Sequence, residues 1–191
     1  MAQEIEIEFK NLLTQQEYHR LLSQIPFPAY SDTQTNYYFE TKDLALQQLG
    51  CALRIREKNG FYRLTLKEPH AQGLLETHDF ITKEEAEACF RGKMVEKPET
   101  SAQLHELGIS LSSLSYFGSL ITERREVQKE DILLVLDYST YNGTSDYELE
   151  LEATSTKNGL AKFNELLTSY RIPKRDTPNK IKRFFSTLNT M

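Results

Sequence analysis

The chain has 191 residues, 27% of them charged, and a formal net charge of −5 at pH 7. This length suits one domain (residues 1–191), and the acidic balance argues against binding nucleic acid through a basic surface. Cys51 and Cys89 are too few for a disulfide framework, no apolar run approaches the roughly 20 residues of a membrane span, and the first strand begins too early for a signal peptide. We expect a cytoplasmic protein with no membrane or nucleic-acid partner.

The first predicted element is a strand over residues 4–10, in which charged and apolar residues alternate. Ile5, Ile7 and Phe9 would face a core. The opposite face consists of Glu4, Glu6, Glu8 and Lys10. One interpretation is an antiparallel strand with a solvated face. However, carboxylates about 7 Å apart repel by about 2 kcal/mol at an effective dielectric near 20, so something cationic should face them.

A helix and an aromatic-rich strand follow. Thr14, three residues before Glu17, predicts the start of a helix, and Pro26 ends it. Residues 35–40 are predicted to form a wall strand rich in aromatic side chains, and residues 44–49 a short helix.

The next two strands carry a basic pattern. Residues 51–58 and 61–67 are predicted to pair through a two-residue turn at Asn59 and Gly60. Alternation then places four cations on one face: Arg54, Arg56, Arg63 and Lys67. Guanidinium groups bind phosphate oxygens in a planar, bidentate manner and lysine adds a point charge, so this mixture suits a polyphosphate. A solvated basic hairpin is the alternative.

The middle of the chain carries fewer signals. Residues 69–73 are predicted to form a loop and residues 74–82 a strand with Glu76 and His78 on one face. His78 has no companion histidine or cysteine at ligand spacing, so we interpret it as a polar wall residue. Thr82 should cap a helix that ends near residue 90, and residues 91–113 form a polar connection with a short helix.

The second half repeats the alternating design. Strands are predicted over residues 115–128, with Arg124 and Arg125 on opposite faces, and over residues 132–138, which includes Asp137. After a turn at Asn142 and Gly143, a second acidic ladder appears: Glu148, Glu150 and Glu152. A helix over residues 157–170 and a final helix complete the chain, and Lys182 and Arg183 are expected on the surface of the latter.

Acidic and basic strands therefore share one alternating design. A flat sheet with a charged, water-exposed face is possible, but a closed barrel with its charged faces inward explains the segregation of charge better. We expect an α+β fold, mainly antiparallel β, with a polar tunnel and helices packed outside it.

Glu6, Glu8 and Lys10 near the N-terminus, followed by paired arginines, a later lysine and a C-terminal Glu-x-Glu, resemble the CYTH family of triphosphate tunnel metalloenzymes. The resemblance implies a closed eight-stranded antiparallel barrel whose tunnel binds a triphosphate and a divalent metal, Mg²⁺ or Mn²⁺. It also implies that Arg124 and Lys180 are tunnel cations.

The predicted site follows from the carboxylates and cations together. Carboxylates are the ligands that Mg²⁺ and Mn²⁺ prefer. The candidate metal ligands are Glu6, Glu8, Asp137, Glu148, Glu150 and Glu152, and which two of the last three bind metal stays open. The candidate substrate-binding residues are Lys10, Arg54, Arg56, Arg63, Lys67, Arg124 and Lys180. The candidate catalytic residues are Glu6, Glu8, Lys10, Arg54, Arg56 and Glu150.

The expected activity is metal-dependent hydrolysis of a small-molecule triphosphate by water that the metal activates, because no nucleophile with a paired base is evident. Inorganic triphosphate is the expected substrate and diphosphate a poor one, since the predicted charged face lacks a cluster of aromatic or amide side chains that could select a base. Alternatives are a class IV type adenylate cyclase, a thiamine triphosphatase and a non-catalytic polyphosphate-binding module. The protein would be a monomer or a homodimer.

Overall fold

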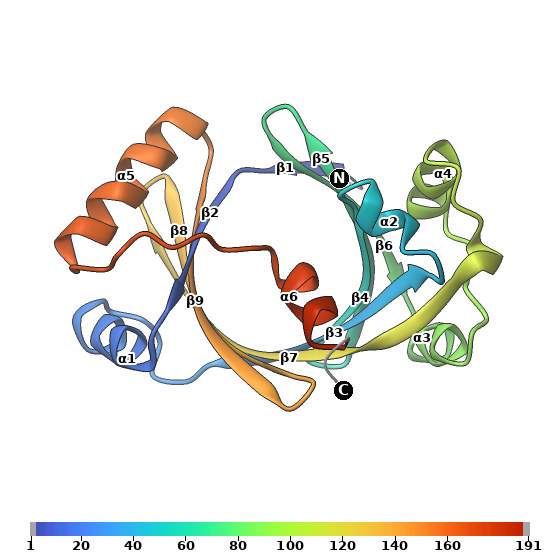
Figure 1. The fold of residues 1–191 in the computed structure, drawn as a ribbon, viewed down its shortest axis with the longest axis horizontal. Coiled ribbons are helices and arrows are strands. Elements are labelled where there is room, and N and C mark those ends of the chain that lie inside the picture. Colours follow the sequence, from blue (N-terminus) through green and yellow to red (C-terminus); the bar gives the residue numbers. More distant parts are fainter. Residues whose placement is uncertain (1–2, 189–191) are drawn as a thin grey trace. The chain divides into compact units, whose positions relative to one another are not determined.

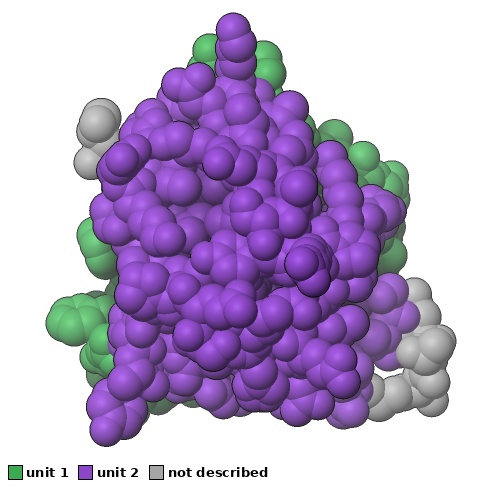
Figure 2. Space-filling model, turned by 90° about the vertical axis from the view of Figure 1, so that its left-hand side faces the viewer, with its two compact units in different colours: residues 1–5, 34–120 green, residues 6–33, 121–191 purple. Residues whose placement is uncertain are grey.

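The computed structural model describes residues 3–188 (Figure 1). The chain forms two compact units, which Figure 2 colours separately: unit 1 comprises residues 1–5 and 34–120, and unit 2 comprises residues 6–33 and 121–191. Each unit has antiparallel strands with helices against one face and charged side chains on the other. That the whole chain behaves as one domain stays a prediction.

Unit 1 is built mainly from five strands and the start of a sixth: β1 (Gln3–Glu6), β3 (Asp32–Thr41), β4 (Ala52–Lys58), β5 (Phe61–His70), β6 (Gly73–Ile81) and β7 (Leu114–Lys129). Its helices are α2 (Ala45–Gln48), α3 (Lys83–Phe90), α4 (Pro98–Glu106) and the 3₁₀ turn η1 (Leu111–Ser113). Strands β3 to β6 pair in sequence order, so each alternating pattern continues onto its neighbour. Asn59 and Gly60 both have positive φ, as the predicted two-residue turn requires.

The helices of unit 1 cover its apolar face. Leu53, Ile55 and Leu64 are fully buried against side chains from all three helices, among them Leu46, Cys89 and Leu104. As predicted, Thr82 caps α3: its hydroxyl accepts from the Glu85 amide, and the Glu85 carboxylate accepts from the Thr82 amide. The opposite face of the same strands is left for polar residues.

Unit 2 contains β2 (Glu8–Leu13), the remainder of β7, β8 (Ile132–Tyr141) and β9 (Thr144–Ala153). Its helices are α1 (Gln15–Gln24), α5 (Thr156–Ser169) and α6 (Lys180–Leu188). The apolar face of β8 and β9 packs on α1 and α5 through fully buried leucines such as Leu136 and Leu149, with Leu21 and Phe163 opposite them. At Gly159 in α5 a Cβ would lie 2.6 Å from the Phe9 ring, so the close approach of helix and strand requires glycine.

The structure corrects three expectations. The first strand is broken: β1 ends at Glu6 and lies next to β6, whereas β2 begins at Glu8 and pairs with β9, so the chain changes strand partner at Ile7. For the same reason Ile5 is not in a core but is 45% exposed. The predicted loop at residues 69–73 is also wrong, because β5 and β6 stay paired as far as His70 and Gly73.

The strands of residues 3–188 form one nine-stranded sheet in the order β1-β6-β5-β4-β3-β7-β8-β9-β2. The predicted fold class, a mainly antiparallel barrel with helices outside, is confirmed, with nine strands in place of eight because β1 and β2 are separate. Within the described part of the chain, no helix has the length and apolar character needed to cross a membrane.

Candidate functional site

The polar face of unit 1 carries the four cations of the predicted basic hairpin. In the register of β4 and β5, Arg56 lies opposite Arg63, and Arg54 and Lys67 follow on the same face. The guanidinium of Arg56 donates from Nε to Asn36 Oδ1 at 3.1 Å. Arg54 is only 9% exposed, so the alternative of a solvated basic hairpin does not hold for this residue. This face, here called the cation face, therefore holds its arginines in defined positions.

One buried carboxylate anchors the cation face. Glu76 on β6 contacts the Lys67 ammonium through Oε1, and Arg54 Nη2 lies 3.6 Å from the same oxygen. Its other oxygen, Oε2, lies 3.4 Å from His78 Nε2. Glu76 thus gathers the neighbouring basic side chains around one buried carboxylate.

His78 has partners that sequence spacing did not suggest. Its Nε2 lies 2.9 Å from Glu4 Oε1 and its Nδ1 lies 3.2 Å from Thr65 Oγ1. One ligand atom each from Glu4, Glu76 and His78 lies within 4.8 Å of the others, a donor set that could hold a divalent metal. Sequence reasoning missed this group because Glu4 lies 74 positions before His78.

The polar face of unit 2, here called the acid face, combines β2, β7, β8 and β9. The register places Glu8 opposite Glu152, and Lys10 opposite Glu150. Lys10 contacts the Glu8 carboxylate directly. Burial, together with the nearby carboxylates of Glu6, Glu150 and Glu8, raises the pKa of Glu152 to about 7, although Arg124 acts in the opposite direction. Carboxylates from both N-terminal strands therefore converge with those of β9.

Lys180 at the start of α6 contacts three acids at once. Its Nζ lies 2.9 Å from Asp137 Oδ2, 2.9 Å from Glu148 Oε1 and 2.6 Å from Glu150 Oε1. Burial favours the neutral amine, but these carboxylates together raise the pKa of Lys180 well above its usual value. Lys180 is therefore a fixed positive charge in the centre of the acid face.

Arg124 supplies a second cation to the same acids. Its Nε and Nη2 donate to the two oxygens of Asp137 at 2.9 and 2.7 Å, and Nη2 also donates to Glu150 Oε2 at 2.7 Å. Burial raises the pKa of Glu148 to about 7, whereas for Glu150 the ammonium of Lys180 and the guanidinium of Arg124 outweigh burial and lower the pKa. Arg125 points the opposite way, as predicted, and donates to the Tyr18 hydroxyl at 2.9 Å.

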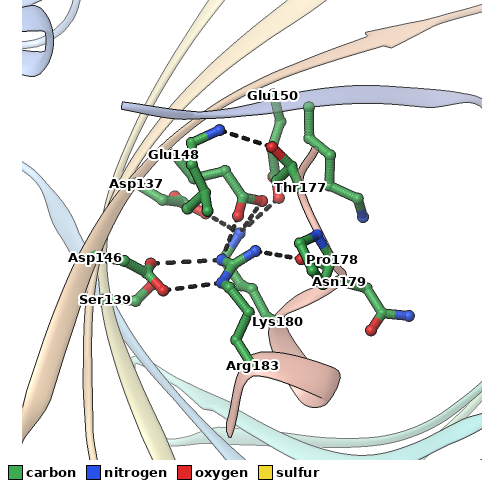
Figure 3. A network of polar contacts seen from close by, with 12 residues as sticks. Asp137, Ser139, Asp146, Glu148, Glu150, Thr177, Pro178, Asn179, Lys180 and Arg183 are labelled. Atoms are coloured by element: carbon green, nitrogen blue, oxygen red, sulfur yellow. Dashed lines mark hydrogen bonds and ion pairs between the residues drawn. The ribbon is translucent and has the colours of Figure 1, made fainter. Parts of the chain in front are cut away.

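Arg183 is buried, which corrects the expectation that it lies on the surface. Figure 3 shows it reaching from α6 toward two carboxylates: Nε donates to Asp146 Oδ2 at 2.9 Å, and Nη2 contacts Glu148. Lys182 is exposed, as expected. Lys180, Arg183 and Phe184 are spaced three and four residues apart, which places them on one side of a helix. This spacing was the sequence signal that could have identified the buried side of α6.

The predicted site residues thus fall into two groups. Those on the cation face of unit 1 are Arg54, Arg56, Arg63 and Lys67. Those of unit 2 are Glu6, Glu8, Lys10, Arg124, Asp137, Glu148, Glu150, Glu152 and Lys180. Their roles in substrate and metal binding stay predictions.

Comparison with known proteins shows the family of the chain. The family model of the CYTH domain matches residues 4–185. The chain belongs to the CYTH domain family. It is also 47% identical over 186 residues to "Putative triphosphatase YjbK" of Bacillus subtilis (strain 168), an alignment that covers 97% of this chain and 96% of that protein. CYTH proteins are enzymes that depend on a metal.

Solved CYTH structures have the same fold. A putative adenylate cyclase from Bacillus halodurans is 41% identical, with a TM-score of 0.92 over 97% of this chain and 100% of that one. HpAC1 from Hippeastrum, a putative adenylyl cyclase with a dominant triphosphatase activity, is 24% identical, with a TM-score of 0.77 over 95% of this chain and 96% of that one. The latter likeness concerns the fold alone.

Proposed function

We propose that this CYTH protein hydrolyses a triphosphate in a reaction that depends on a divalent metal. The observation that carries the proposal is the convergence of Glu6, Glu8 and Glu150 on Glu152, whose pKa is about 7. The carboxylates near Glu152 add to the effect of burial on its pKa, because they lie close enough to repel its charge, and a bound cation relieves that repulsion. All-oxygen donors suit Mg²⁺ or Mn²⁺.

The donor chemistry of the acid face fits such a metal. Glu6, Glu8, Glu150 and Glu152 would hold it, and when bound it would supply Lewis-acid activation of a phosphoryl oxygen and of water. Asp137 and Glu148 are candidate ligands too, and like Glu150 they contact the cations of the acid face. Through these contacts the acids would also place Arg124 and Lys180 beside the metal.

The cations would bind the phosphate chain. Arg56 and Arg124 are oriented by Asn36 and Asp137, so part of the ordering of these guanidinium groups would precede substrate binding and the stabilisation of charge in the transition state. Lys10, placed opposite Glu150, is the cation closest in register to the proposed ligands. We propose that Lys10, Arg54 and Arg56 act on the reacting phosphates, and that Arg63, Lys67, Arg124 and Lys180 hold the rest of the substrate.

Phosphate release from a panel of substrates tests the proposal. Inorganic triphosphate, diphosphate, ATP and thiamine triphosphate are each incubated with Mg²⁺, with Mn²⁺ and with EDTA. We expect phosphate release from triphosphates only, and no release in EDTA. Full turnover in EDTA would refute the proposed dependence on a metal. The Arg54→Ala variant should raise KM and lower kcat, because the guanidinium meets phosphate in the ground and transition states alike.

The products separate the alternatives. The Bacillus halodurans relative bears the name of an adenylate cyclase, so cyclic AMP is measured alongside phosphate. Cyclic AMP and diphosphate as the main products would replace hydrolysis by cyclisation. Tight binding of triphosphate with no product at any metal concentration would identify a binding module instead.

A further inference from the structure

Two phenylalanines of unit 1 are largely exposed to solvent. Phe61 at the start of β5 is 74% exposed, and Phe80 near the end of β6 is 77% exposed. Scattered apolar residues on a surface need no explanation. Here, however, two large aromatic side chains occur on adjacent paired strands.

Both phenylalanines belong to the cation face. Phe80 lies directly opposite Arg63 in the β5–β6 register, and Phe61 precedes Arg63 by two positions, so all three side chains share one side of the sheet. Phe61 is also opposite Lys58 on β4, and Arg56 is opposite Arg63. Diagonal neighbours such as Phe61 and Phe80 are about 7–8 Å apart at Cα, within reach of aromatic side chains. The result is an aromatic pair that adjoins a row of cations, here called the aromatic end.

This combination matches a ligand with a flat ring at one end and negative charge along the rest. Along β5 the distance from Phe61 to Lys67 is about 20 Å, enough for a ring and an extended phosphate chain. Arg63, Arg56 and Lys58 would repel a cationic ring such as a thiazolium. A neutral nucleobase avoids this repulsion and can stack on both phenylalanine and guanidinium.

We propose that Phe61 and Phe80 form a stacking site for the base of a nucleoside triphosphate whose phosphates follow the cations from Arg63 toward Lys67. The inference rests on the proposed function, since it adds an organic substrate class to the inorganic triphosphate. It also revises the premise that aromatic side chains are missing from the charged face. The alternation of Phe61 with Arg63 was visible in the sequence, but its pairing with Phe80 was not.

Equilibrium binding tests the aromatic end independently of turnover. The affinities of ATP with a methylene-bridged β,γ linkage and of inorganic triphosphate are measured by calorimetry on the intact chain with Mg²⁺. In the Phe61→Ala/Phe80→Ala variant we expect the Kd of the ATP analogue to rise about tenfold or more, and that of inorganic triphosphate to change less than about twofold. The Phe61→Tyr/Phe80→Tyr variant keeps both rings and should restore binding. Tyr30→Ala, which removes an aromatic ring that is 90% exposed in unit 2, is the control and should change neither value.

The outcomes separate this inference from the proposed function. An equal rise in the Kd of both ligands, or no change in either Kd, would overturn the proposal that the aromatic end binds a base, even if triphosphate is hydrolysed. Selective loss of the ATP analogue would support it even if the enzyme released no phosphate.

Discussion

The two units share one architecture, but the charged face of unit 1 carries mainly cations and that of unit 2 mainly carboxylates. In each, the apolar residues of alternating strands pack under helices, and the charged residues occupy the other face. On the cation face, Glu76 organises Arg54 and Lys67; on the acid face, Lys180 organises Asp137 and Glu148. Each of these two side chains thus contacts several residues of the opposite charge. The acid face differs in that Lys10, Arg124 and Arg183 add further cations to its carboxylates.

The largest effect should come from a carboxylate on the acid face. Glu150→Gln keeps the shape of the side chain but removes a proposed metal ligand and a partner of Arg124 and Lys180. We expect kcat for inorganic triphosphate to fall by on the order of a hundredfold or more, with circular dichroism unchanged. Glu165→Gln, an exposed acid on α5, is the matched control. Activity within about threefold of wild type would show that Glu150 is not part of the reaction.

The central cation of the acid face should dominate its stability. Lys180→Ala leaves three carboxylates without their shared ammonium, so the free energy of unfolding in urea should fall by about 3–5 kcal/mol. Lys182→Ala on the same helix removes an exposed lysine and should cost less than about 0.5 kcal/mol. Added Mn²⁺ should restore part of the loss in Lys180→Ala, because a divalent metal can replace the missing charge. The absence of any rescue would argue against metal binding near these acids.

Stability should also depend on pH through Glu152. Its pKa is raised by burial and by its acidic neighbours to about 7 in the folded chain, so the folded state holds this proton more tightly than the unfolded state. The contribution is fully present below pH 4.5 and is lost as the pH rises through about 7. Without metal, wild type should lose about 1–2 kcal/mol more than Glu152→Gln between pH 5 and pH 8, after allowance for solvent screening. Identical urea profiles for both proteins would show that the pKa of Glu152 is not raised in the folded state.

The smallest effects compare the units directly. Thr14 caps α1 in unit 2 and Thr82 caps α3 in unit 1, each with a reciprocal bond from a glutamate. Thr14→Ala and Thr82→Ala should each cost about 1 kcal/mol, whereas Ser155→Ala should be nearly neutral because the Ser155 side chain makes no capping bond to α5. If the chain unfolds as one domain, both threonine variants shift the same urea transition. Two transitions that respond separately would contradict the single-domain prediction.

Local pattern was sufficient for much of the fold. The alternation in the charged strands predicted which side chains share a face, the Thr-x-x-Glu signals predicted α1 and α3, and the Asn-Gly turns at residues 59–60 and 142–143 predicted two hairpins. These succeed because side-chain direction, capping and turn geometry depend on residues that are near one another in the chain.

Register and long-range contacts were decided only by the tertiary structure. The break at Ile7, the contact of Glu4 with His78, the burial of Arg183 and the placement of Phe80 opposite Arg63 all depend on which strand or helix becomes a neighbour. An alternating pattern predicts which face of the sheet a side chain occupies. It does not predict which residue lies opposite that side chain on the neighbouring strand. The sequence by itself therefore determined the charges of the site, and pairing between distant segments decided how those charges meet.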